Sequence, residues 1–554
     1  MVRNVLSLMT REIRGLHEAA YLLAFFTFFS QILALVRDRT FAHFFGAGPT
    51  LDSYFAAFRI PDVVFAFLTL FVSAFAIIPL LAEHGGHESK ESRRLIGGVL
   101  VVFGFTAIAI SALLFFAIPN IVPKLFPGFD SLAVANVIEL SRIMLLQPIF
   151  LGFSSIVASV IQASRRFFIY ALAPIFYNVG IIFGALFLYP HIGISGLAWG
   201  VVIGAVLHLG VQIIPFAMHS GLWKPVVVKE SFRDVLRVCI LSLPRALALS
   251  ANQVLLLVFA SAASLAVTGS VAVISFGFNL QSVPLSIIGV SYASALFPAL
   301  ALLFSSGKLE KFSFEVWTAI RHIIFWITPA IALIVVLRAH MVRVILGSGA
   351  FGWDETRLTA AVFAIFALSL IAQGAILVFS RAYYAAGRSI EPIAINVLSA
   401  IFAGVIAFAG VGWFQQATVS RFFLEDLFRI SNVPGSEVIM IAVAYTGVLL
   451  VTSVVFAVVF SVRFGFEKRT LQTIFHSFSA SVLGAITTYG VLQLFAPVLQ
   501  VDTFLGIFIQ GAVAGVFGIL VWSGALMLLK NPEFSEALLV LRRFFKKKTN
   551  SVSN

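Results

Sequence analysis

Two arginines near the start of the chain have the residue type and setting of an anion-binding site. Arg37 and Asp38 directly follow the first apolar run, which ends at Val36. Arg59 lies inside the second apolar run, three residues before Asp62. A guanidinium group is always charged, and its fork of N–H donors matches the oxygens of a phosphate. These residues indicate an anion site or, as the alternative, a structural ion pair between Arg59 and Asp62.

Arginine within an apolar segment is costly, so its position is informative. An unpaired arginine at the centre of a bilayer costs from about 2.5 to more than 10 kcal/mol unless it faces water or a counter-ion. Arg59 and Arg245 lie well inside apolar runs, and we expect Arg59 to line an aqueous cavity. Arg142 and Arg321 lie nearer the ends of their runs. Snorkelling of the side chain to the membrane surface explains these two.

Other polar side chains accompany these arginines in the apolar segments. The acidic residues closest to Arg59 in sequence are Asp38, Asp52 and Asp62. The amides spread over several segments are Gln147, Asn178, Asn252, Gln253, Asn279, Gln281, Gln373 and Asn396. A buried amide can hydrogen-bond a neighbouring helix or contact a ligand, and both interpretations stay open for each of them.

Catalytic chemistry has little support in the sequence. The chain contains neither a phosphate-binding G-x-x-x-x-G-K-[ST] loop nor an H-E-x-x-H zinc motif. The cluster from Glu83 to Glu88 is interpreted as a solvated loop, and the single Cys239 excludes internal disulfides and cysteine-based metal sites. We therefore expect a protein that is not an enzyme, with no catalytic residue, metal or cofactor. Coupling to Na⁺, to H⁺ or to the membrane potential stays open.

The composition defines the elements that must position these residues. Of the 554 residues 60% are hydrophobic and 11% are charged, and the mean hydropathy is +1.04. Such a chain cannot form a soluble surface, so we predict an all-α polytopic membrane protein. The net charge of +13 does not indicate nucleic-acid binding, because the basic residues concentrate in short loops and in the tail.

A window of about 20 residues per span predicts fourteen transmembrane helices. The expected spans are 19–36, 54–82, 94–118, 138–163, 168–189, 194–218, 236–266, 269–304, 314–337, 357–386, 391–413, 437–462, 471–498 and 502–530. With the N-terminus inside, inner segments carry 25 Lys and Arg residues and outer segments carry 8. This bias places both termini in the cytoplasm.

Two segments of similar sequence indicate an internal repeat. QASRRFFIYALAPIFYN ends at Asn178, and FSRAYYAAGRSIEPIAIN ends at Asn396, which is 218 residues later. A repeat of six helices gives two parallel halves with a cavity between them, and this arrangement is typical of alternating-access transporters. The predicted parts are an amphipathic segment 1–18, repeats 19–218 and 236–462 joined by a linker 219–235, two extra helices 471–530, and a basic tail 531–554.

The tail combines an apolar flank with basic residues. Phe534, Leu538, Leu541, Phe544 and Phe545 can share one side of a helix, next to five Lys and Arg residues between 542 and 548. Such a helix would lie on the membrane and attract anionic lipids. A simple stop-transfer tail is the alternative.

The opening stretch resembles the MurJ (MviN) family of lipid II flippases, whose superfamily includes the MATE exporters and the polysaccharide flippases. The resemblance rests on VRD, then FGAG, Asp52, FAAFRIP and IIPLLAE. QASRRFFIYALAPIFYN, VPLSIIGVSYASALFPAL and AYYAAGRSIEPIAIN extend it over most of the first twelve expected spans. The number of spans is also similar to that of the family.

The resemblance implies a flippase that moves lipid II, an undecaprenyl-pyrophosphate-linked disaccharide-pentapeptide, from the inner to the outer leaflet of the bacterial cytoplasmic membrane. It implies a cationic central cavity for the pyrophosphate and a groove near the two extra helices for the lipid tail. The expected partners are lipid II and anionic lipids, and we expect a monomer. The expected substrate-binding residues are Arg37, Asp38, Asp52, Arg59, Arg245 and Asn279.

The chain departs from the family pattern at several positions. Gln31, Phe65-Ala66 and Asn279 stand where the family usually has arginine, and Leu70-Phe71 replaces an acid-glycine step. A related flippase of lipid-linked oligosaccharides or a MATE-like ion-coupled exporter is therefore kept as an alternative. A scaffold or a glycosyltransferase-like enzyme is a third, but the outer segment 414–436 is short for an active site.

Overall fold

The computed structural model describes residues 16–84, 89–219, 231–496 and 503–539. These residues form helices joined by short turns, and they include no strand. The prediction of an all-α membrane protein is therefore confirmed. The predicted segment 1–18 and linker 219–235 fall largely outside the described residues, as does the tail beyond residue 539.

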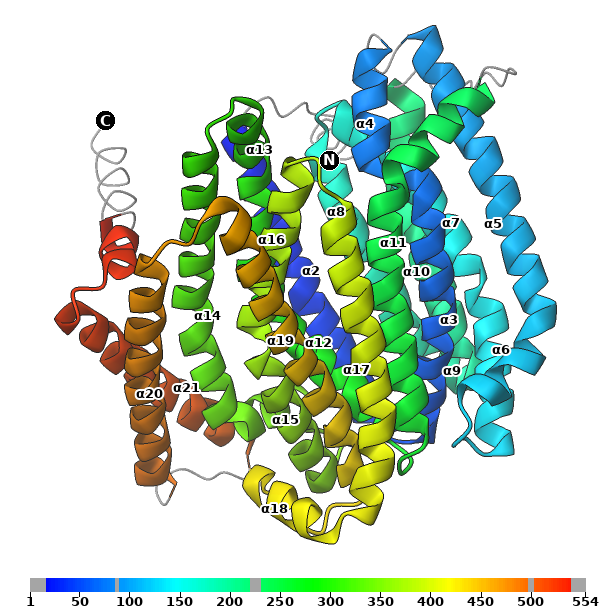
Figure 1. The fold of residues 1–554 in the computed structure, drawn as a ribbon. Helices are drawn as coiled ribbons and strands as arrows, with labels where there is room; N and C mark the ends of the chain where they lie inside the picture. Colours follow the sequence, from blue (N-terminus) through cyan, green and yellow to red (C-terminus); the bar gives the residue numbers. More distant parts are fainter. Residues whose placement is uncertain (1–15, 85–88, 220–230, 497–502, 540–554) are drawn as a thin grey trace, which may run out of the picture. The chain divides into compact units, whose positions relative to one another are not determined.

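The helices form two compact units. Unit 1 comprises Met1–Ala272 and Gly349–Phe351, and unit 2 comprises Val273–Ser348 and Gly352–Asn554. The helices of unit 1 are α2 (Leu16–Phe45), α3 (Pro49–Val72), α4 (Ala74–Glu83), α5 (Lys90–Leu125), α6 (Ser131–Met144), α7 (Leu146–Ala163), α8 (Phe167–Phe183), η1 (Gly184–Leu188), α9 (Tyr189–Ile192), α10 (Ser195–His219) and α11 (Ser231–Ser264) (Figure 1).

Unit 2 contains the remaining helices, apart from the first residues of α12. They are α12 (Ser270–Pro284), η3 (Leu285–Val290), α13 (Ser291–Ser305), α14 (Leu309–Ile345), α15 (Trp353–Leu368), α16 (Leu370–Ala385), α17 (Ile390–Gln416), α18 (Thr418–Phe428), η4 (Ser436–Val438), α19 (Ile439–Phe464), α20 (Arg469–Phe495) and α21 (Phe504–Leu528). The segment after α21 is helical again over 532–539.

The described residues contain 12 helices that are long and apolar enough to cross a membrane, or 13 if the bent pair α15–α16 counts as one span. The expected span 19–36 falls within α2, which is not among them, so the number fourteen stays a prediction. α11 is part of unit 1, although its sequence lies in the predicted second repeat. The symmetry of the two halves likewise stays a prediction.

Proline marks several breaks within the spans. Pro148 follows the break between α6 and α7 at Leu145, and Pro284 ends α12 where the wider turn of η3 begins. Proline lacks the amide donor that the helix needs, so the ladder of hydrogen bonds loosens just before it. Both breaks therefore lie next to a proline.

Glycines bring α8 and α10 together in unit 1. A Cβ on Gly180 of α8 would lie 2.3 Å from the Cα of Gly204, and one on Gly184, the first residue of the adjoining η1, would lie 2.5 Å from the Cα of Gly200. Only glycine permits two helices to approach so closely, and spacings of four residues are typical of membrane helix pairs. This contact fixes α8, which carries Asn178.

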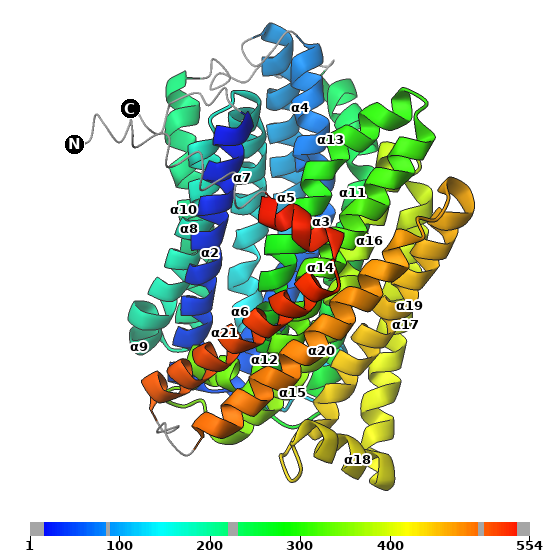
Figure 2. The same ribbon diagram turned by 90° about the vertical axis from the view of Figure 1, so that its left-hand side faces the viewer.

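In unit 2, the long helix α14 packs along both α20 and α21. Figure 2 shows α20 and α21 side by side, with the segment after α21 turning back toward α14. Two expectations fail here. Phe534 is 9% exposed and packs against Phe325 and Trp522, so it does not face lipid. Arg321 is 3% exposed and pairs with Glu533, so it does not snorkel.

Candidate functional site

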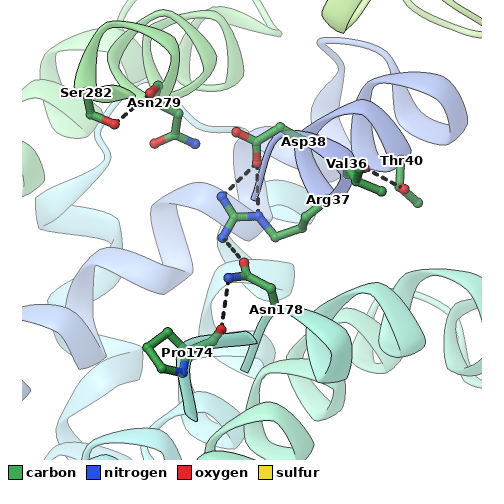
Figure 3. A network of polar contacts seen from close by, with 8 residues as sticks. All are labelled: Val36, Arg37, Asp38, Thr40, Pro174, Asn178, Asn279 and Ser282. Atoms are coloured by element: carbon green, nitrogen blue, oxygen red, sulfur yellow. Dashed lines mark hydrogen bonds and ion pairs between the residues drawn. The ribbon is translucent and has the colours of Figure 1, made fainter. Parts of the chain in front are cut away.

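Arg37 lies at the centre of a polar network in unit 1 (Figure 3). Its Nε and Nη2 donate to Oδ1 of Asp38 at 3.0 and 2.8 Å, and its Nη1 donates to Oδ1 of Asn178 at 3.2 Å. The amide nitrogen of Asn178 donates in turn to the carbonyl of Pro174 at 3.1 Å. The Arg37 side chain keeps 19% exposure while Asp38 keeps 2%. The network therefore joins α2 to α8, and part of the Arg37 side chain stays exposed.

Arg59 and Asp62 form the second charged pair of unit 1, both on α3. They interact electrostatically, as the spacing of three residues predicts. The amide nitrogen of Gln147 on α7 donates to Oδ1 of Asp62 at 3.4 Å. Gln147 is 2% exposed, whereas Arg59 and Asp62 are half-buried. Asp62 is thus the counter-ion of Arg59 and is held by a neighbouring helix.

Two tyrosines connect the charged pairs. Tyr54 on α3 interacts electrostatically with Arg37, Asp38 and Asp62. Tyr177 on α8 interacts with Asp62, Tyr54 and Arg37. We use the term charged cluster for Arg37, Asp38, Tyr54, Arg59, Asp62, Gln147, Tyr177 and Asn178. The sequence analysis missed both tyrosines, although a phenol inside an apolar span is itself a signal because its hydroxyl group needs a partner.

Asp52 has a structural environment of its own. Its two carboxylate oxygens accept the backbone N–H groups of Gly269 at 2.5 Å and Ala272 at 2.9 Å. The carboxylate thereby caps the start of α12, and it is 3% exposed. Gly269 has φ +97°, and a Cβ there would lie 2.1 Å from the carbonyl oxygen of Ala47. Because its oxygens are engaged by backbone amides, we do not carry Asp52 into the binding site.

The other two predicted residues belong to α12 and α11. Asn279 belongs to unit 2, where its backbone carbonyl accepts the hydroxyl group of Ser282 at 2.7 Å (Figure 3). Arg245 lies on α11, and its side chain is outside the part of the chain that the structure describes. Among the described residues of unit 1, the structure brings together the predicted site residues Arg37, Asp38 and Arg59.

The charges of the cluster balance one another. Two guanidinium groups face two carboxylates, so the cluster does not attract anions through a net positive charge. An arriving phosphate would instead displace Asp62 from Arg59, or contact the exposed part of the Arg37 side chain. Charge-assisted hydrogen bonds donated by arginine are stronger than neutral ones, and a low local dielectric constant strengthens them further.

The fold is similar to that of solved membrane transporters. The solved structure "Lipid II flippase MurJ, inward closed conformation" is similar with a TM-score of 0.72 and 20% sequence identity, covering 94% of this chain and 100% of that chain. An inward-facing multidrug resistance MATE transporter of the MOP superfamily is similar with a TM-score of 0.65 and 15% identity, covering 80% of this chain and 96% of that chain. Both likenesses concern the fold.

The family follows from the sequence itself. The profile of the family "Lipid II flippase MurJ" matches residues 41–514. The chain belongs to this family, as the resemblance predicted. A probable lipid II flippase MurJ of Buchnera aphidicola subsp. Acyrthosiphon pisum is 27% identical over 71% of this chain and 78% of its own length. The lipid II flippase MurJ of Burkholderia cenocepacia is 24% identical over 72% and 80%. The chain is therefore a multi-pass bacterial membrane protein and not an enzyme.

Proposed function

We propose that this protein moves lipid II from the inner to the outer leaflet of the bacterial cytoplasmic membrane, in support of peptidoglycan synthesis. Membership of the MurJ family supports the substrate and the direction. The charged cluster supports recognition of the pyrophosphate of the substrate. Guanidinium groups inside a membrane protein match the charge and the oxygen geometry of a pyrophosphate. The observation that carries the proposal is Arg37, whose side chain is 19% exposed and is held by two partners, Asp38 and Asn178.

In this proposal the two arginines share the pyrophosphate. Arg37 is held in place by Asp38 and Asn178, so it presents a fixed donor group. Arg59 is neutralised by Asp62 when no substrate is bound. Such pairing lowers the cost of keeping an arginine within the membrane. Asn279 and Arg245 are further candidates for head-group contacts.

Alternating access would carry the head group across. The two predicted halves would rock around a shared chamber, as in other transporters with parallel repeats. The membrane potential would act on the anionic head group with about 2.3 kcal/mol per charge per 100 mV, and this drives it outward. Coupling to Na⁺ or H⁺ is the alternative energy source. We place both termini in the cytoplasm and expect a monomer whose basic tail attracts anionic lipids.

A related lipid-linked oligosaccharide is the second candidate substrate. The specific observation in its favour is the loss of cations, since Phe65, Ala66 and Asn279 replace arginines that the family usually has. A different sugar with the same polyprenyl pyrophosphate would still use Arg37 and Arg59. Head-group preference in a transport assay separates the two substrates.

Complementation tests the proposed function. A bacterium depleted of its own lipid II flippase is supplied with this chain, and lipid II in the outer leaflet is measured. We expect growth and outer-leaflet lipid II to be restored, and Arg59→Ala to abolish both. Arg142→Ala is the control, because Arg142 lies at the end of a helix and donates to the carbonyl of Phe115. Continued lysis with the unchanged protein present in the membrane would contradict the proposal.

A further inference from the structure

The short helix α18 carries its large apolar residues on the side that faces away from the protein. Four of these side chains are between 57% and 85% exposed, and they are Val419, Phe422, Phe423 and Leu427. Their spacings of three, four and eight residues place them on one face of a helix. Asp426, in the last turn, is the charged residue of that face. A surface helix of a globular protein turns its apolar face inward, so the arrangement here is the reverse.

The opposite side of α18 is polar and is fastened to the protein. Glu425 is 4% exposed, and its Oε1 accepts Nε of Arg421 at 2.7 Å and the hydroxyl group of Ser436. Directly after the helix, Nε and Nη2 of Arg357 on α15 donate to the carbonyl of Arg429 at 3.0 and 2.7 Å. Leaving a buried carboxylate without its partners is strongly destabilising. These contacts therefore hold α18 with its apolar face outward.

The apolar face of α18 follows directly on the exposed surface of a membrane span. α17 is long and apolar enough to cross a membrane, and Ala417 is the residue between it and α18. Figure 1 shows α18 at the end of α17, turned across the direction of that span. The exposed apolar side chains of α17 extend to its last turn, and they are Leu398, Ile401, Phe402, Val405, Ile406 and Trp413. Tryptophan at the end of a span is typical of the membrane–water interface. α18 thus begins where the hydrocarbon region ends.

Basic residues gather at the same end of unit 2. Arg338, Arg343, Arg357, Arg421 and Arg429 are five of the eight Lys and Arg residues that the predicted topology places outside. Arg338 on α14 and Arg429 after α18 interact electrostatically, and both are positively charged. Two guanidinium groups that repel each other are stabilised by an anion between them, and a phosphate offers oxygens to both. The charge at this end of unit 2 therefore favours a ligand that carries phosphate.

We propose that α18 is an interfacial helix lying on the outer leaflet, with its apolar face against the acyl chains and with Arg338 and Arg429 binding the phosphate of an anionic phospholipid. The lipid bilayer is the occupant that the observations favour, because the face adjoins the exposed surface of a span and Arg429 follows the helix directly. Asp426 keeps the helix at the level of the headgroups, where water still solvates a carboxylate. Interfacial helices with basic residues bind anionic membranes more tightly than zwitterionic ones.

A lipid-bound α18 would hold the outer end of unit 2 at a fixed depth in the membrane. Such anchoring goes beyond the proposed transport of lipid II and needs no substrate. Both measurements below therefore omit lipid II, and their outcomes do not depend on what the protein transports.

The accessibility of a nitroxide spin label tests the location of the apolar face. In a Cys239→Ser background, the full-length protein in lipid nanodiscs carries the label on Phe423→Cys, Val405→Cys or Asp354→Cys. Val405 on α17 is the lipid-facing reference, and Asp354 at the start of α15 is the water-facing reference, because both side chains are 62% exposed. We expect the label at position 423, like that at 405, to collide more often with oxygen than with a water-soluble nickel chelate.

Two results of this measurement would overturn the interfacial helix. A label at position 423 that behaves like the label at 354 would place the apolar face in water. A label shielded from both oxygen and the chelate would show that another protein chain, and not lipid, covers the face.

The preference for anionic lipid tests the phosphate site. A fluorescent probe on Phe423→Cys, in the same background, is quenched by bromine-labelled lipid in the nanodisc. We expect phosphatidylglycerol to quench about twofold more than phosphatidylcholine at the same mole fraction, because each basic residue near the surface adds attraction for an anionic headgroup. Arg338→Gln combined with Arg429→Gln should abolish this difference.

A second pair of arginines provides the matched control. Arg388 and Arg463 both pair with Glu391, so Arg388→Gln combined with Arg463→Gln removes the same charge from unit 2 at another site. We expect this control to keep the preference for phosphatidylglycerol. Equal quenching by the two lipids while Arg338 and Arg429 are present would overturn the phosphate site. A preference that added inorganic phosphate abolishes would overturn it as well, since the site would then bind a free anion and not a lipid.

Discussion

Arg37 and Asn178 are 141 positions apart in the chain, yet Nη1 of the first donates to Oδ1 of the second at 3.2 Å. The bond links α2 to α8, and Asn178 is itself oriented by the carbonyl of Pro174. Asp38 holds the opposite side of the same guanidinium group. The position of Arg37 is therefore defined from two helices, and this is what a fixed phosphate-binding group requires.

Replacing Asn178 tests this positioning. Asn178→Ala removes a hydrogen bond to a charged group, and we expect it to lower the free energy of unfolding by about 1.5–3 kcal/mol. Transport should fall further than the loss of folded protein explains, because Arg37 becomes mobile. Thermal unfolding in detergent and outer-leaflet lipid II measure the two effects. Asn396→Ala is the control, since its amide contacts only Ser380 at 3.5 Å among the hydrogen bonds described for it. A transport loss equal to that of the control would contradict the prediction.

Removing the charge of Asp62 tests the exchange of anions at Arg59. Asp62→Asn takes away the carboxylate that competes with phosphate, so we expect the affinity for inorganic pyrophosphate to rise about tenfold, which corresponds to roughly 1.4 kcal/mol. Isothermal titration calorimetry on the purified protein measures the affinity. Asp354→Asn removes an equal charge from a side chain that is 62% exposed, and it should change nothing. An unaltered affinity in Asp62→Asn would show that Asp62 does not compete for Arg59.

The sequence predicted the elements better than the contacts between them. Hydropathy placed the spans because the bilayer imposes their length and composition on each segment separately. The partner of Arg59 was predictable because three residues on a helix determine it. The partners of Asp52 are 217 and 220 positions away, and nothing local in the sequence indicates them. Arg321 appeared to be a snorkelling residue for the same reason, since seven further α-helices separate its helix α14 from Glu533 in the chain.

A substitution of Asp52 tests whether this residue stabilises the fold or binds the substrate. Asp52→Ala leaves the amides of Gly269 and Ala272 without their acceptor, and loss of a helix cap costs about 0.5–2 kcal/mol. We expect a lower unfolding temperature by differential scanning fluorimetry and an unchanged pyrophosphate affinity per folded molecule. A weaker pyrophosphate affinity with unchanged stability would instead show that Asp52 belongs to the binding site.

The contact between α8 and α10 predicts opposite effects on stability for alanine substitutions at two glycines of α10. A Cβ on Gly204 would lie 2.5 Å from the carbonyl oxygen of Tyr177, whereas nothing lies within 4 Å of one on Gly210. Gly204→Ala must therefore push α8 away, which strains the backbone that carries Tyr177 and Asn178. Gly210→Ala meets open space and gains the better helix propensity of alanine, worth up to about 1 kcal/mol.

We accordingly expect Gly204→Ala to unfold at a lower temperature than the unchanged protein and to lose transport, because the Arg37–Asn178 bond of 3.2 Å lengthens. Gly210→Ala should unfold at the same or a higher temperature and retain transport. We would measure thermal unfolding and outer-leaflet lipid II for both variants in parallel. Equal behaviour of the two variants would mean that the close approach of α8 and α10 does not position the charged cluster. The two variants add the same methyl group to the same helix, so a difference between them must come from the atoms that surround each methyl group.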